Sequence, residues 1–284
     1  MKKITVVIPV YNGAHTVLKS INSLKHQTFK NWCCIIVNDG STDSTKDVLC
    51  SIDDDRFLIV NFKENKGRPT ARQTALKMVK TKYMCMLDAD DWYYPHKLEM
   101  QFEYMEAHVD ITLMSTTWAI VDSHNKLYSV VSIGEEIKKY KFKNYLDYVH
   151  VPHASSIIRM EDVGKVCYNL NLKFAEDTDF MRRLLIGKNY VVKNELTYVY
   201  NRDQSFSLDK YIKSVNYVIE SIYSLPISKI SKFKEFLKLK AKISVVFFVL
   251  KLGGIKWYLN KMGRAANLFE KEEFERVKNI IFEK

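Results

Sequence analysis

Strand-like and helix-like segments alternate over the first 90 residues of this chain. Four short apolar or β-branched runs, at residues 4–10, 33–37, 57–62 and 83–87, have the length and character of buried strands. Helical spacing or helix-start residues fill the intervals, at 14–26, 44–51 and 70–80. Such alternation predicts a parallel sheet joined by right-handed crossovers, so the expected fold class is α/β.

Polar residues and turn formers follow each predicted strand, and the fourth strand ends in Asp88, Asp90 and Asp91. In open α/β sheets, ligands bind beyond the carboxyl ends of the strands. Two acids spaced i, i+2 at such an end can share a hard divalent cation, which keeps waters and also binds substrate phosphates. Aspartate is equally favoured in turns and at helix N-caps, so this purely local interpretation stays open.

The second half of the chain has a less regular pattern. Residues 96–107 are expected to form a helix, 111–121 and 127–132 two strands, 142–149 a short helix, and 154–159 a further strand. Residues 175–179 cap an amphipathic helix that runs to residue 186, and Gly187 ends it. A strand at 190–200 follows, and the pattern is helical from residue 208 to the end.

Composition narrows the class of protein. The 284 residues suit one large α/β domain, or such a domain with a helical extension. No run of 18 apolar residues occurs, so no membrane-spanning helix is predicted. The five cysteines form no C-x-x-C pair, which favours reduced thiols in a cytoplasmic protein over a disulfide frame or zinc site.

Five segments, taken together and in order, resemble glycosyltransferase family 2 enzymes with the GT-A fold. These segments are residues 7–12, 37–43, 65–72, 87–92 and 176–180. The resemblance covers roughly residues 4–205. It implies a Rossmann-like half that binds a nucleotide sugar, residues 1–95, fused to an acceptor half, residues 96–207. A basic helical region would then occupy residues 208–284.

The resemblance implies a nucleotide-sugar donor, most often a UDP-sugar, and a Mn²⁺ or Mg²⁺ cofactor. Asp39 would hydrogen-bond the uracil, Arg72 would lie near the base or diphosphate, and Asp88 would contact the ribose or donor sugar. Asp90, with Asp88, would ligate the metal, and Asp91 would orient the loop. The full set of implied donor contacts is Pro9, Val10, Tyr11, Asn12, Asp39, Asn65, Gly67, Arg72, Asp88 and Ala89.

Several of these residues also have a plain structural interpretation. Asn12 and Gly67 are common turn formers, and Asp39 could make a local Asx turn. Arg72 could be a solvated residue on its helix. The sequence leaves these alternatives open.

The resemblance to family 2 also implies an inverting enzyme. In such an enzyme an activated acceptor hydroxyl displaces the leaving group at the anomeric carbon in one step. The resemblance places the general base at Asp177, with Glu176 beside it to orient it or touch the acceptor. His153 and Trp92 fall where an acceptor would bind. The competing interpretation of the acids is helix N-capping, which suits Asp179 best, and a lone histidine in an apolar stretch is often structural.

The chain departs from the family pattern after the last predicted strand. Many relatives carry a histidine there that holds metal or diphosphate, whereas residues 200–205 contain none. Arg202 or Asp203 could replace it. The motif and membrane helices of processive members are also missing, which favours addition of a single sugar, as in cell-surface polysaccharide synthesis.

The formal net charge of +11 is concentrated near the C-terminus, where residues 229–264 contain ten Lys or Arg and one acid, Glu235. A basic segment interleaved with aromatic residues can lie on an anionic membrane, where lipid-linked acceptors reside. Simple packing of its apolar faces on the catalytic domain is the alternative. The expected location is therefore the cytoplasm, either free or peripheral at the inner face of the membrane.

Other functions would leave different patterns. A sugar nucleotidyltransferase would need a glycine-rich, basic phosphate-binding segment near residue 10, and the sequence there is Pro9-Val-Tyr-Asn-Gly13. A nucleic-acid-binding protein would place basic residues in its groove, yet here acids converge on the predicted pocket. A relative that binds sugar without catalysis would not need Asp90 and Asp177, and the presence of both argues against it.

Overall fold

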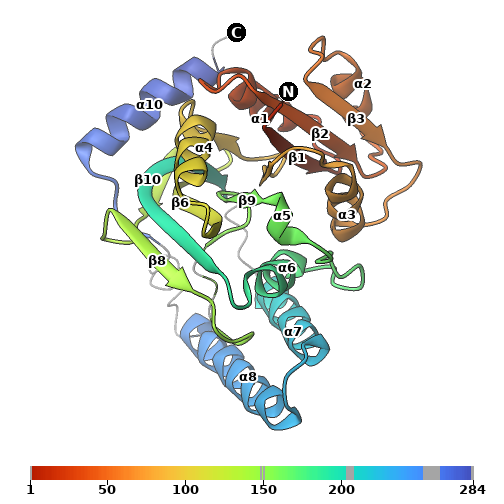
Figure 1. Ribbon diagram of the computed structural model, residues 1–284, viewed down its shortest axis with the longest axis vertical. Coiled ribbons are helices and arrows are strands. Elements are labelled where there is room, and N and C mark those ends of the chain that lie inside the picture. Colours follow the sequence, from red (N-terminus) through yellow and green to blue (C-terminus); the bar gives the residue numbers. More distant parts are fainter. Residues whose placement is uncertain (1, 148, 150, 203–207, 252–262, 283–284) are drawn as a thin grey trace.

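The computed structural model describes residues 2–147, 149, 151–202, 208–251 and 263–282 (Figure 1). Its first part is a parallel sheet in the order β3-β2-β1-β4, which confirms the expected α/β class. The strands are β1 (Ile4–Val10), β2 (Trp32–Asn38), β3 (Phe57–Asn61) and β4 (Tyr83–Met86). The helices between them are α1 (Val17–Lys25), α2 (Thr45–Cys50) and α3 (Arg68–Met78).

Helices cover both faces of this sheet, which explains why β1 is apolar along its whole length. Alternate β1 residues point to opposite faces. Ile4, Val6 and Ile8 join one core cluster with Val17, Ile21 and Leu24 of α1. Val7 joins a second cluster with Ala71, Ala75 and Leu76 of α3. A strand buried on both sides needs a continuous hydrophobic run, as the sequence has.

The sheet continues without a break into the second half of the chain. The described strands form one ten-stranded sheet, in which β9 lies antiparallel between β4 and β6, and β10 lies parallel to β6. Its remaining strands are β5 (Trp92–Tyr93), β6 (Ile111–Val121), β7 (Leu127–Val131), β8 (Ile137–Lys141), β9 (Ile157–Arg159) and β10 (Asn189–Asn201). The helices of this part are α4 (Lys97–Ala107), α5 (Met160–Val163) and α6 (Glu176–Leu185).

The prediction of a short helix at residues 142–149 is wrong. Phe142 follows the edge strand β8, which pairs antiparallel with β10, and the described residues after it form turns. The backbone N–H groups of Lys143 and Asn144 both donate to one Asp147 carboxylate oxygen at 2.9 Å, which closes a turn instead of a helix. β8 was missed because its sequence, Ile-Lys-Lys-Tyr-Lys, lacks an apolar run, as suits an edge strand.

Three further helices follow, α7 (Leu208–Ser224), α8 (Lys229–Lys251) and α10 (Leu268–Phe282). The expectation of helix to the end is corrected at Arg264, which forms a β-bridge with Val130. Among the described residues, no helix is both long and apolar enough to cross a bilayer. In Figure 1, α7 and α8 lie together at one end of the molecule, whereas α10 returns to the N-terminal end near α1.

Gly40, just after β2, provides a test of how the loops beyond the sheet pack. It has a φ of +67°, and a Cβ built on it would lie 2.2 Å from the carbonyl carbon of Glu64. We expect Gly40→Ala to lower the free energy of unfolding by about 2–4 kcal/mol, through left-handed strain and a backbone clash. Denaturant unfolding followed by circular dichroism measures it.

The matched control is Gly187→Ala, because Gly187 has a φ of +75° with no atom within 4 Å of the added Cβ. It carries only the left-handed penalty, about 1–2 kcal/mol. Equal losses for the two variants would contradict a close approach of residues 40 and 64.

Candidate active site

A pocket of about 480 Å³ lies beyond the carboxyl ends of β1, β2 and β4, and is called here the carboxyl-end pocket. Most of the residues predicted from the donor motifs line it: Pro9, Val10, Tyr11, Asn12, Asp39, Asp88, Ala89 and Asp90. Its other lining residues, not predicted from the sequence, are Gly13, Thr16, Arg68, Ala71 and Tyr200. Asn65, Gly67 and Arg72 do not line it.

Asn12 ties the loop after β1 to the loop after β2. Its backbone N–H donates to the Ser41 hydroxyl at 2.9 Å, and its side-chain oxygen accepts from the Thr42 N–H at 2.8 Å. Its φ of +51° is one that asparagine tolerates better than most residues. Asn12 is therefore a turn former and a pocket-lining residue at once.

Asp39 organises the loop before α3. It is 3% exposed, and one of its carboxylate oxygens accepts from the Lys66 N–H at 2.7 Å. Burial raises the pKa of Asp39, and the backbone N–H groups of Lys66 and Gly67 partly offset this. The bond to Lys66 spans 27 positions, so it is not a local Asx turn. It holds Gly67 at the start of α3 and leaves Asn65 exposed on the loop.

The three aspartates after β4 have different environments. Asp91 is fully buried and accepts hydrogen bonds from the Tyr198 hydroxyl and, at 2.7 Å, from the Asn201 N–H. The Ser20 hydroxyl of α1 donates to the Asp91 carbonyl at 2.6 Å. Burial, together with the charges of Asp90 and Asp88, raises the pKa of Asp91 well above its usual value. Asp91 thus fastens this turn to α1 and β10, as expected for a residue that orients the loop.

Asp88 and Asp90 face the carboxyl-end pocket and fit a divalent cation. Partial desolvation and the charge of Asp88 raise the pKa of Asp90, which reflects a repulsion that a cation would relieve. The described residues contain no cluster of three metal-ligating side chains. A cation that keeps waters and binds substrate phosphates needs only one or two carboxylates. The donor set present therefore suits Mg²⁺ or Mn²⁺.

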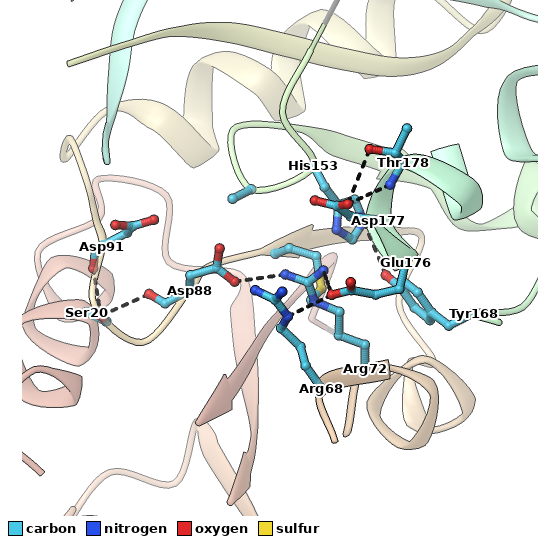
Figure 2. A network of polar contacts seen from close by, with 12 residues as sticks. Ser20, Arg68, Arg72, Asp88, Asp91, His153, Tyr168, Glu176, Asp177 and Thr178 are labelled. Carbon is cyan, nitrogen blue, oxygen red and sulfur yellow. Dashed lines mark hydrogen bonds and ion pairs between the residues drawn. The ribbon is translucent and has the colours of Figure 1, made fainter. Parts of the chain in front are cut away.

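Arg72 connects the turn after β4, which carries Asp88, to the first turn of α6 (Figure 2). One nitrogen, Nη2, lies 2.9 Å from an Asp88 carboxylate oxygen, and Nη1 lies 2.8 Å from Oε1 of Glu176. Arg68 reaches the same Glu176 oxygen at 2.7 Å. Burial alone would lower the pKa of Arg72, but Asp88, Glu176 and Asp177 together raise it. Arg72 is thus a buried link and not a solvated helix residue.

The acids at the start of α6 are also distinct from one another. Glu176 is 1% exposed, burial raises its pKa, and its second carboxylate oxygen has no partner among the described residues. Asp177 is half-buried. Burial alone would raise its pKa, but the surrounding positive charges, with Arg72 the largest and Arg68 among them, and the Thr178 backbone N–H together hold the pKa below its usual value. Asp179 is buried and accepts from Arg183 at 2.8 Å and Ser221 at 2.7 Å. Asp179 therefore has the structural role expected of it.

Asp177 lines a second pocket, of about 310 Å³, called here the α6 pocket. Its lining residues are Trp118, Val149, Val151, Pro152, His153, Asp177, Thr178, Met181 and Arg182. His153 is 3% exposed and lies with its Nε2 3.2 Å from the Tyr168 hydroxyl. Burial, and then the charge of Arg72, lower the pKa of His153 to about 3, so the ring is neutral. Trp118 and Arg182 were not predicted from the sequence.

Trp92, expected on the acceptor side, is wholly buried. It stacks on Tyr94 with ring centroids 5.7 Å apart and packs against Phe274 of α10. This leaves no surface for an acceptor, so the expectation is corrected. The sequence placed Trp92 beside the aspartates but could not show that a helix 180 residues later covers it.

The region expected to replace the missing histidine is only partly described. Arg202 donates its backbone N–H to the Val121 carbonyl at 2.9 Å, which extends β10, and Tyr200 lines the carboxyl-end pocket. Asp203 lies outside the described residues.

The geometry thus comprises two pockets, one lined by Asp88 and the other by Asp177, with the buried guanidinium of Arg72 bonded to Asp88 and to Glu176 beside Asp177. The sequence model of glycosyl transferase family 2 matches residues 5–164. A protein named as an uncharacterised glycosyltransferase of Methanocaldococcus jannaschii is 30% identical over 229 residues, or 75% of this chain and 77% of that protein. The chain therefore belongs to glycosyl transferase family 2.

A second relative is named for its reaction. The Escherichia coli UDP-Glc:alpha-D-GlcNAc-diphosphoundecaprenol beta-1,3-glucosyltransferase WfgD is 32% identical over 122 residues. The match covers 43% of this chain and 48% of that protein. The chain thus spans about half the length of this relative.

Solved structures confirm the GT-A fold. The structure of Staphylococcus aureus TarS 1-349 in complex with UDP-GlcNAc has a TM-score of 0.60 at 19% identity, and the match covers 81% of this chain and 69% of that chain. A mannosyltransferase of Pyrobaculum calidifontis, in complex with GDP-Man and Mn²⁺, has a TM-score of 0.59 at 15% identity. That match covers 85% of this chain and 69% of the mannosyltransferase.

Removal of Arg72 tests the link between the pockets. We expect Arg72→Gln to lower the free energy of unfolding by about 3–5 kcal/mol, because it leaves the buried Glu176 without its most buried cation. Thermal and denaturant unfolding measure this. Arg276→Gln is the control, since Arg276 pairs with Glu273 at a side-chain exposure of 63% and should change stability by less than about 1 kcal/mol. Similar small effects of both substitutions would show that Arg72 does not join the two elements.

Proposed function

We propose that this chain transfers one sugar, with inversion, from a UDP-sugar to a hydroxyl of a lipid-linked glycan acceptor, with Mn²⁺ or Mg²⁺. The observation that carries the proposal is the Asp88–Arg72–Glu176 bridge, which ties Asp88 of the carboxyl-end pocket to the turn that carries Asp177 of the α6 pocket. The names of WfgD and TarS support a UDP-sugar donor, and the name of WfgD supports a lipid diphosphate acceptor.

The donor would occupy the carboxyl-end pocket. One Asp39 oxygen is held by Lys66, which leaves the other to accept from a uracil N–H. The segment from Pro9 to Asn12 would enclose the nucleoside. Arg68, 46% exposed and lining the pocket, supplies a positive charge for the diphosphate where the sequence had suggested Arg72. Asp90 and Asp88 would hold the cation, which offsets negative charge on the leaving diphosphate.

The acceptor would enter the α6 pocket. Asp177 is charged at neutral pH because its pKa lies below the usual value, so it can accept the proton of the attacking hydroxyl. Thr178 donates its backbone N–H to Asp177 at 2.7 Å and helps to fix the carboxylate. Glu176 orients this turn through the two arginines. Attack from this pocket on a donor held in the other gives a single displacement with inversion. In this division, residues 1–95 hold most of the donor site and 96–207 the acceptor site.

We expect Asp177→Asn to reduce kcat for sugar transfer by about 10²–10⁴-fold, the usual contribution of a general base. Transfer is measured with a panel of UDP-sugars and Mn²⁺, and donor binding by calorimetry with UDP. The Kd for UDP should change less than about twofold, because Asp177 lies in the other pocket. The control is Asp110→Asn, on the exposed pair with Lys139. Transfer by the Asp177 variant at the parent rate would exclude this base.

We further propose that α8 lies on an anionic membrane surface. Its exposed apolar residues are Ile230, Phe233, Leu237, Val245, Phe247 and Phe248. Exposed lysines, including Lys234, Lys238 and Lys242, lie among them. Val246 is buried, so part of α8 packs on the protein, as the alternative of simple packing expects. The exposed apolar side chains named above are not covered in this way. Exposed aromatic and basic side chains together match an anionic lipid surface. Trp257 and Tyr258, two aromatic residues of the same basic segment, lie outside the described residues.

Liposome co-sedimentation tests this second proposal. A variant with Phe233, Leu237 and Phe248 replaced by serine should bind liposomes of 30% phosphatidylglycerol at least about tenfold more weakly, because it loses inserted apolar area. Replacement of Leu58, Tyr128 and Leu268, which are exposed elsewhere, is the matched control. Unchanged binding of the first variant, or equal binding of the parent to neutral liposomes, would contradict it.

A further inference from the structure

Arg182, on α6, has an unpaired guanidinium in the wall of the α6 pocket. Its Nε and Nη1 atoms are buried, and neither has a hydrogen-bond partner among the described residues. The neighbouring Arg183 is different: it donates to Asp179 at 2.8 Å and to Ser224 at 2.7 Å. Of these two adjacent arginines, Arg183 thus hydrogen-bonds to other parts of the fold, whereas the buried nitrogens of Arg182 do not.

The acids nearest to Arg182 are already committed to other groups. Asp179 accepts from Arg183 and from Ser221, and Glu235 of α8 forms an ion pair with Lys238 at 3.3 Å. Burial lowers the pKa of Arg182, and the charges of Glu235 and Asp179 offset this only in part. Arginine stays charged in proteins, so this site holds a partly desolvated cation that forms no ion pair with any acid in the described part of the chain.

Arg182 and the proposed base lie on the same pocket wall. Asp177 and Arg182 are five residues apart on one helix, which is about 7.5 Å along its axis. Trp118, Val151 and Met181 supply apolar surface in the same pocket. The two side chains also point about 140° apart around the helix axis, so a hydroxyl at Asp177 and an anion at Arg182 would be separated by at least this rise, which leaves room for a sugar ring against the apolar wall.

We infer that Arg182 binds a phosphate ester carried by the acceptor sugar, on the side of the ring away from the reacting hydroxyl. This inference rests on the proposed function and specifies its acceptor: the sugar directly attached to a lipid phosphate, instead of a neutral sugar further along a glycan. The position of α8 favours a phosphate over a sugar carboxylate. The charge of its Glu235 acts on Arg182, so the helix that carries exposed apolar and basic residues lies near this pocket.

The test is calorimetric binding of three hexyl probes to the full chain, with UDP in excess to occupy the carboxyl-end pocket. The probes are hexyl diphosphate, hexyl glucuronide and the uncharged hexyl glucoside. We expect Arg182→Gln to raise the Kd for hexyl diphosphate by about tenfold or more, the loss of a charge-assisted hydrogen bond. Arg182→Lys should lose less, and the Kd for hexyl glucoside should stay within about twofold.

Arg276→Gln is the matched control, because it removes the same charge from an exposed position on α10. The thermal midpoint of Arg182→Gln should equal or exceed that of the parent chain, since the buried Nε and Nη1 of Arg182 make no hydrogen bond to the residues that the structure describes. A clear fall in the midpoint would point to a structural role instead.

Equal Kd values of the parent and Arg182→Gln for hexyl diphosphate, or no binding by the parent, would overturn the inference. Arg182-dependent binding of the glucuronide alone would replace the phosphate with a carboxylate and overturn it also. Because binding is measured without turnover, a chain that binds hexyl diphosphate through Arg182 but transfers no sugar contradicts the proposed function alone.

Discussion

A single buried guanidinium holds the site together. Arg72 belongs to α3, yet its two terminal nitrogens reach the turn after β4 and the first turn of α6. A buried charge of this kind is stable only while both partners stay in place, because a lost partner leaves an uncompensated charge in a poorly solvated site. The apolar face of α6 packs in the core, and this bridge ties the first turn of α6, which carries Asp177, to the turn after β4. The two pockets keep their relation because both elements bind the same side chain.

The carboxylates around this bridge are sorted by their surroundings. Asp91 and Asp179 are buried among hydrogen-bond donors and serve the fold. Glu176 is buried against two arginines and serves as a support. Asp88, Asp90 and Asp177 keep part of their surface open to a pocket. The same chemical group thus has three roles, and burial with its partners decides which role each residue has. The open carboxylates are the ones available to a cation or a reacting hydroxyl.

The sequence predicted the N-terminal half well because its information is local. Apolar runs gave four parallel strands, and polar residues at their ends gave most of the lining of the carboxyl-end pocket. Predictions failed where the structure depends on distant partners. β8 carries no apolar run and exists because β10 offers it an edge, and Trp92 is covered by α10. Arg68 and Arg72 lie on one helix and look alike in sequence, yet one lines the pocket and the other is buried beneath it.

Sequence alone determined the α/β class, the family and the motif residues, because hydrophobic period and turn chemistry act between near neighbours. Tertiary structure decided which of those residues are open to a ligand, which arginine bridges Asp88 and Glu176, and which arginine has no ion pair among the described residues. The physical reason is that desolvation and charge pairing depend on residues far apart in the chain, such as Arg72 and Glu176, which are 104 positions apart. Only the folded arrangement brings such groups within hydrogen-bond distance.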